Sequence, residues 1–146
     1  MNTTEKLQAA RKAAAERFEA IAALYVPVGW TVKYRKNLMG RCYHTHKLIA
    51  APQPRTRKAL CIFLHECAHA CLHGGKRKPR HVEEWEAEQW AYAKMREHGI
   101  AVPRAMTLRG KAHVGYKIAQ AMARGANSID SRAKAFANSL RRKSRG

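Results

Sequence analysis

The sequence predicts a small α+β fold in which helices surround a β-hairpin or small sheet. Its 146 residues suit one domain, or at most two. Apolar residues form 46% of the chain, an ordinary fraction for a globular protein, so wholesale disorder is excluded. Helical periodicity dominates the pattern, and only the segment 30–51 has the composition of strands.

The N-terminal elements are predicted to be a helix and a hairpin. Apolar residues recur at steps of three and four from Leu7 to Tyr25, which predicts an amphipathic helix. The segments 30–34 and 43–51 are rich in β-branched and aromatic residues and predict two strands. Residues 37–40, which end in glycine, would form the turn that joins these strands as a hairpin.

Two helices are predicted in the middle of the chain. Thr56 can cap a helix that runs to about His73, where two consecutive glycines end it. This helix is apolar on nearly every side, so we expect it to be buried. A second helix is predicted from about Val82 to His98.

A basic C-terminal extension is predicted after Pro103. Two helices, at about 108–124 and 130–141, flank a break at 125–128. We therefore predict a domain over residues 1–103 and a helical extension over residues 104–146. This helical pair could pack on the domain or form a nucleic-acid-binding hairpin, and its closing residues RRKSRG are expected to fray.

The predicted buried helix contains the motif HExxH, formed by His65, Glu66 and His69. The two histidines are one turn apart, so both imidazoles project from one face and can bind one Zn²⁺. Glu66 follows the first histidine and can reach a metal-bound water as general base. A chain of this composition contains about 0.03 such motifs by chance. His73, one further turn along, is expected to cap the helix end or face solvent.

A catalytic zinc site needs a third protein ligand, and two candidates remain open. Glu84 shares a face of the next helix with Glu88 and with small alanines, which would let this face approach the HExxH helix closely. In that arrangement Glu84 binds the metal, and Glu88 accepts the ring N–H of a ligand histidine. The other candidate is His81, twelve residues after His69.

A family resemblance rests on the stretches FLHECAHACLH and EWEAEQWA. Together they resemble the ImmA/IrrE family of metallopeptidases, whose pattern is HExxHxxLH followed by a helix of the form E-x-E-A-(D/N)-x-F-A. Four positions of the second stretch match, whereas Glu88 replaces Asp or Asn and Trp90 replaces Phe. The resemblance covers about residues 28–100; the matching positions are Glu84, Glu86, Ala87 and Ala91.

This resemblance implies a small zincin-like α+β fold. It implies Zn²⁺ held by His65, His69 and Glu84, with Glu66 as the catalytic base. Members of the family cleave repressors or other regulators, often for mobile elements or in stress responses.

A second, weaker resemblance involves the segment HVEEW at 81–85. It is similar to the HGxx(F/W) motif of SprT-like proteases, in which the histidine is the third zinc ligand. The glycine of that motif and a zinc-ribbon CxxC are missing from the sequence. This resemblance implies a metal site completed by His81 and an activity on DNA-bound proteins.

Positive charge is the main compositional feature, with 29 Lys and Arg against 10 Asp and Glu, a net charge of +19. The segments 1–60 and 100–146 carry the excess, whereas 61–99 is balanced. A surface this basic favours a polyanionic partner, above all nucleic acid. No DNA-reading motif is present, so non-specific contacts to phosphates are predicted. The candidates for these contacts are Lys117, Arg124, Arg132, Lys134, Arg141 and Arg142.

Membrane association and secretion are not expected. No apolar run approaches the roughly 18 residues that span a bilayer. The N-terminal segment carries acidic residues and has no apolar stretch, unlike a secretory signal. We therefore expect a cytoplasmic protein, in which the four cysteines are reduced.

Together these patterns predict a zinc-dependent endopeptidase that cleaves a protein substrate, with a DNA-bound regulator as the first candidate. The alternative is a zinc-stabilised module that binds nucleic acid or protein without turnover. Glu66 distinguishes the two, because a purely structural site needs no general base.

Overall fold

The computed structural model describes residues 1–143, with side chains up to residue 139, and it confirms the α+β class. The predicted helices over 56–73, 82–98, 108–124 and 130–141 are all present, with ends shifted by a few residues. In chain order, the elements are α1 (Thr3–Ala23), β1 (Thr31–Arg35), β2 (Arg41–Tyr43), β3 (Leu48–Pro52), α2 (Arg57–Leu72), α3 (Arg80–Glu97), α4 (Arg104–Ala123) and α5 (Ser131–Lys143).

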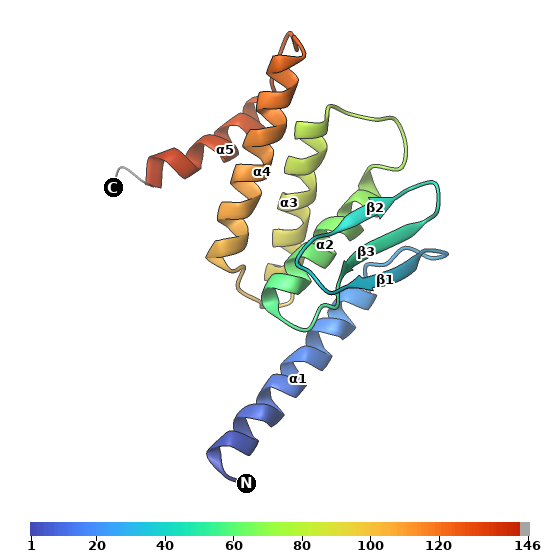
Figure 1. Cartoon of the computed structure of the whole chain (residues 1–146), viewed down its shortest axis with the longest axis vertical. Helices are drawn as coiled ribbons and strands as arrows, with labels where there is room; N and C mark the ends of the chain where they lie inside the picture. Colours follow the sequence, from blue (N-terminus) through green and yellow to red (C-terminus); the bar gives the residue numbers. More distant parts are fainter. Residues whose placement is uncertain (144–146) are drawn as a thin grey trace.

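The first helix, α1, packs on the protein only through its C-terminal half (Figure 1). A capping box between Asn2 and Glu5 begins the helix. Its buried residues all lie in the second half, whereas Leu7 is 49% exposed. The amphipathic face predicted from Leu7 onwards is therefore buried only from Ala15 to the end of the helix.

The sheet corrects the predicted hairpin between 30–34 and 43–51. The strand order is β1-β3-β2, so β3 is central. It pairs in parallel with β1 and antiparallel with β2. The segment predicted as one strand is broken by a turn, in which Lys47 has a φ of 49°. β3 takes the centre because it is the most buried strand, and β2 occupies the crossover that a parallel pair requires.

Helix α2 lies between the sheet and α3, as the prediction of a buried helix requires (Figure 1). The Thr56 hydroxyl caps it by accepting the Ala59 N–H at 3.1 Å. Leu60, Leu64 and Cys67 are completely buried on the helix. The HExxH motif is therefore held on the best-packed element of the structure.

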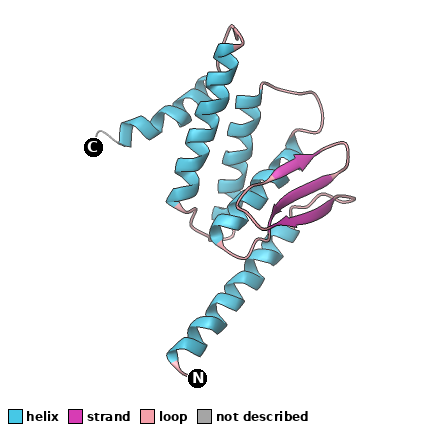
Figure 2. Ribbon diagram, in the orientation of Figure 1, coloured by secondary structure: helices cyan, strands magenta, loops and turns pink. Residues whose placement is uncertain are grey.

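Helices α3, α4 and α5 lie on the side of α2 opposite the sheet. Figure 2 shows the strands on the other side of α2. α4 approaches α3 closely at Gly110, where an added Cβ would lie 2.5 Å from Glu88 Oε2. α5 packs on α4 through Val114, Ile118 and Ala133. The division of the chain after residue 103 stays a prediction. None of the described helices is long and apolar enough to cross a membrane.

Candidate metal centre

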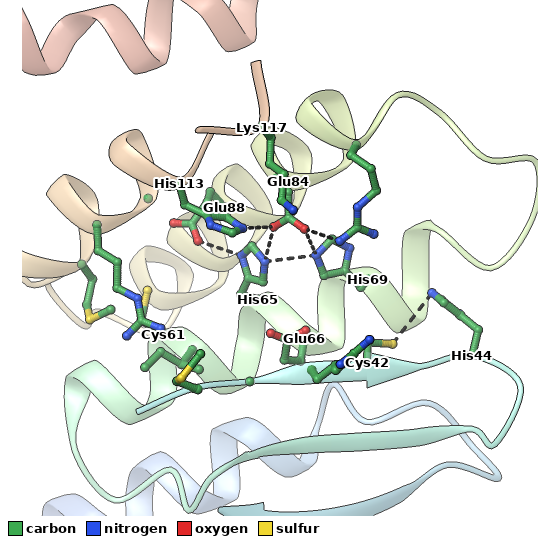
Figure 3. A pocket seen from close by; sticks show the side chains of 18 of the residues that line it. Cys42, His44, Cys61, His65, Glu66, His69, Glu84, Glu88, His113 and Lys117 are labelled. Carbon is green, nitrogen blue, oxygen red and sulfur yellow. Dashed lines mark hydrogen bonds and ion pairs between the residues drawn. The ribbon is translucent and has the colours of Figure 1, made fainter. Parts of the chain in front are cut away.

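The residues predicted as metal ligands come together between α2 and α3. His65 Nε2 lies 2.9 Å from Glu84 Oε2, and His69 Nε2 lies 3.4 Å from Glu84 Oε1. The two histidine Nε2 atoms are 3.0 Å apart. Figure 3 shows the three side chains converging on one point. This His65–His69–Glu84 group could hold a metal ion.

The donor atoms of this group suit zinc in number, type and spacing. Catalytic zinc sites commonly have three protein ligands drawn from histidine and carboxylate, at 2.0–2.2 Å. Atoms bound tetrahedrally at such distances are about 3.3 Å from one another. With Glu84 Oε2 as the ligand oxygen, its separation of 2.9 Å from His65 Nε2 and the 3.0 Å between the two histidine nitrogens are both close to that value.

The alternative third ligand, His81, does not join the group. Its Nε2 accepts the backbone N–H of Asp130 at 3.1 Å, and its side chain is buried at the start of α3. This contact fixes the ring against the loop before α5. The structure therefore favours Glu84 over His81.

Glu88 occupies the position predicted for a partner of a ligand histidine. Its Oε1 lies 2.7 Å from His65 Nδ1, the ring nitrogen that faces away from the metal group. The contact is close but bent, because Nδ1 makes no hydrogen bond of acceptable angle. A carboxylate at this nitrogen fixes the ring's tautomer and orientation.

His73 is the C-cap residue of α2, in agreement with the predicted role at the helix end, but it does not face solvent. It is buried, and its Nδ1 lies 2.8 Å from His69 Nδ1. Its Nε2 in turn lies 3.1 Å from Glu86 Oε1. When His69 Nε2 binds a metal, its Nδ1–H can donate to His73, whose Nε2–H donates to Glu86. Both ligand histidines therefore have an outer partner.

Burial and ion pairing determine the charges of the metal group. Burial alone would lower the pKa of His65, but its close contacts with Glu84 and Glu88 raise it well above its ordinary value. Burial alone would raise the pKa of Glu84, but hydrogen bonds from His113, His65 and His69 bring this pKa far below its ordinary value. Without metal, the two carboxylates favour the charged form of His65 between them.

Glu66 lies beside the metal group, on the side that faces β2 (Figure 3). Its side chain is buried, which raises its pKa to about 7. No residue of the described chain makes a hydrogen bond or ion pair with its carboxylate. Glu66 lines a cavity and is not among the residues with buried, unpartnered polar atoms, so its carboxylate is accessible from that cavity.

Gly40 provides the space that Glu66 occupies. A Cβ added at Gly40 would lie 2.6 Å from Glu66 Oε2 and 2.7 Å from Glu66 Cγ. Any side chain at this position would displace the carboxylate.

We therefore expect Gly40→Ala to keep the metal, because no ligand is touched, and to impair any activity that needs Glu66. A displacement of about 1 Å at a catalytic group can cost about 10²-fold in rate. Gly75→Ala is the matched control, since nothing lies within 4 Å of its added Cβ. Metal content and turnover of both variants check this, and equal activity of the two would contradict it.

A cavity of about 660 Å³ opens over Glu66 and the metal group. β2 contributes Arg41 and Cys42 to its wall. α4 contributes Arg109, His113 and Lys117, which recur at four-residue steps and so share one helix face. The cavity is large enough for several side chains of a bound polypeptide.

His113 is the residue of this site that the sequence reasoning missed. Its Nε2 lies 3.4 Å from Glu84 Oε2, and its side chain is 46% exposed. The four-residue spacing of charged groups along a predicted helix was the available signal. Only the packing of α4 on α3 shows that this face turns toward the metal group.

The residues predicted to contact nucleic acid lie on α4, at its C-cap and on α5. Lys117 and Arg124 line a second cavity. Arg132 instead pairs with Asp130 at 3.1 Å and lies over the Trp85 ring. Lys134 is exposed on α5. The side chains of Arg141 and Arg142 fall outside the described residues.

Comparisons of the chain with protein-family models, curated proteins and solved structures found no match. The functional argument therefore rests on the geometry of this site.

Proposed function

We propose that this protein is a zinc-dependent endopeptidase. The observation that carries the proposal is the buried, unpaired Glu66 carboxylate beside a His65–His69–Glu84 group that could hold a metal ion. A nearby cavity offers room for a polypeptide. A metal group, a general base and a substrate cavity are the parts that metal-assisted hydrolysis requires.

The chemistry divides between the bound ion and the chain. Bound zinc would act as a Lewis acid toward the scissile carbonyl and the attacking water. Glu66 would accept the proton of that water and then transfer it to the leaving amine. Burial raises the pKa of Glu66, which makes it a stronger base than an exposed carboxylate.

The surrounding residues would hold the reacting groups in place. Glu88 and His73 contact the outer ring nitrogens of the two ligand histidines and so fix their orientation. Among the described strands, β2 pairs only with β3, so its other edge is free. An extended substrate could pair with this edge, since β2 also lines the cavity.

The same observation favours an enzyme over a zinc-stabilised binding module. A structural site would close its coordination with a fourth protein ligand. Here the group has three such ligands, and the adjacent Glu66 makes no bond that would support the fold.

We also propose that the substrate is a protein bound to nucleic acid. The support is electrostatic, because a net charge of +19 attracts polyanions and their bound proteins. A DNA-bound regulator is the first candidate to assay.

The proposal predicts cleavage of unfolded polypeptides by the zinc-loaded protein. A proteome-derived peptide library incubated with it should yield new termini, identified by mass spectrometry. The matched control is the same protein after chelation, which should produce none until zinc is restored. A zinc-loaded protein that cleaves neither the library nor a nucleic-acid-bound protein would contradict the proposed function.

A further inference from the structure

The cavity over the metal group has a strongly basic wall. The lysine and arginine residues that line it are Arg41, Arg77, Arg80, Arg109 and Lys117. We propose that this cavity selects polypeptide substrates with acidic side chains on both sides of the cleaved bond. The peptidase function proposed above is the premise, and an acidic segment is the substrate class that its cavity would take.

The carboxylates of this cavity do not neutralise its wall. Among the described residues, the carboxylates that line it are those of Glu66, Glu84 and Glu88. Glu84 and Glu88 contact His65 at 2.9 and 2.7 Å and so belong to the metal group. Glu66 lies beside that group (Figure 3). Away from the metal group, the described part of the wall therefore carries cations and no carboxylate.

Three of these cations are available to a bound molecule. Arg77 pairs with Glu83 at 3.0 Å, and Arg80 pairs with Glu84 at 3.1 Å. The others make no ion pair with a carboxylate of the described residues; they are Arg41, Arg109 and Lys117. A carboxylate in the cavity could therefore form charge-assisted hydrogen bonds that the protein itself does not provide.

The available cations lie on two sides of the metal group. Arg41 belongs to β2, which Glu66 faces, whereas Arg109 and Lys117 belong to α4. Figure 3 shows Lys117 on the side of the metal group opposite Glu66. The free edge of β2 offers backbone N–H and C=O groups, which pair with an extended polypeptide rather than with a nucleic-acid strand. The cavity therefore favours an acidic polypeptide over nucleic acid.

The two α4 cations are spaced to contact side chains on both sides of a cleaved bond. Arg109 and Lys117 are eight residues apart, which is about 12 Å along a helix. An extended chain covers this length in about four residues, and its residues i and i+4 point to the same face. His113 lies midway and is 3.4 Å from Glu84, so the metal group faces the middle of this interval. We therefore expect two acidic residues about four positions apart, with the cleaved bond between them.

The test is a profile of the bonds that the zinc-loaded protein cleaves in a proteome-derived peptide library. The readout is the frequency of Asp and Glu at each position around the new termini. The variants Arg109→Gln and Lys117→Gln each remove one α4 cation. Arg11→Gln and Lys12→Gln are the matched controls, because both residues are exposed on α1.

We expect Asp and Glu to be enriched on both sides of the cleaved bond. Arg109→Gln should remove the enrichment on one side and Lys117→Gln on the other, whereas both controls retain it. Each loss should lower kcat/KM for an acidic peptide about tenfold, since one charge-assisted hydrogen bond is removed. Cleavage without acidic enrichment, or variants that match their controls, would refute the acidic preference and leave the proposed function intact.

Binding of an uncleaved peptide separates the acidic preference from peptide cleavage. The probe is a fluorescein-labelled peptide with two glutamates four positions apart, compared with the same peptide carrying glutamines. Anisotropy is recorded on Glu66→Gln protein in the presence of zinc. We expect the glutamate peptide to bind more tightly by about tenfold for each contact, and Arg109→Gln in the same protein to remove one tenfold step. Arg11→Gln should remove none.

The two readouts fail in different ways. If no library peptide is cleaved, the proposed function is wrong, and tighter binding of the glutamate peptide still supports an acidic segment as the occupant. Equal affinity for the two peptides would overturn the proposal. An equal loss of affinity for a single-stranded 12-nucleotide DNA in the Arg109→Gln variant would also overturn it, because the cavity would then be a nucleic-acid site.

Discussion

Glu66→Gln is expected to leave zinc bound and the fold intact while cleavage falls by about 10²–10⁴-fold. Glutamine has nearly the shape of glutamate, so it fits the space beside Gly40 that the carboxylate occupies. It can hydrogen-bond a water molecule but cannot accept the proton that makes water a nucleophile. Because Glu66 bonds no residue of the described chain, its replacement removes no stabilising contact.

The measurement is turnover of a library-derived peptide, with zinc content and thermal unfolding recorded for the same samples. Glu16→Gln on the exposed face of α1 is the matched control. It should cleave at the wild-type rate. If Glu66→Gln does the same, Glu66 is not the base and the proposed mechanism is wrong.

His69→Ala is expected to lose the metal, and with it both activity and zinc-dependent stabilisation. The substitution removes one of three ligands and also removes one of the contacts of Glu84 and one of the contacts of His73. At free zinc a thousandfold above the dissociation constant, bound metal stabilises a protein by about 4 kcal/mol. In this variant, added zinc should therefore no longer raise the unfolding temperature.

His81→Ala distinguishes the two candidate ligand sets. Since His81 bonds the Asp130 backbone and stands outside the metal group, its loss should leave zinc content unchanged. Zinc content by elemental analysis and unfolding by calorimetry check both variants. If His81→Ala loses zinc and Glu84→Ala retains it, the SprT-like assignment would be correct.

The local parts of the site could be predicted from the sequence because they depend on helical spacing. One turn separates His65 from His69 on α2, and one turn separates Glu84 from Glu88 on α3. The small side chains Ala87 and Ala91, both completely buried, are consistent with the close approach of these helices. Spacing and side-chain size were sufficient to place all four residues.

The parts that depend on long-range packing could not be predicted. The order β1-β3-β2 follows from which strand is most buried in the assembled sheet, whereas the sequence favoured a local hairpin. His113 reaches the metal group only because Gly110 lets α4 approach α3. The contact of His73 with Glu86 likewise joins α3 to the end of α2. Sequence periodicity identifies a helix face but does not identify the element that covers it.

X-ray absorption at the zinc edge, on protein loaded with one equivalent of zinc, tests the central claim most directly. The claim predicts one tightly bound zinc per chain, with two histidine nitrogens and carboxylate oxygen at about 2.0–2.2 Å. It also predicts no sulfur ligand, since the four free cysteines lie outside the ligand group. Zinc that fails to bind, or a spectrum dominated by sulfur at about 2.3 Å, would contradict the metal site and the function built on it.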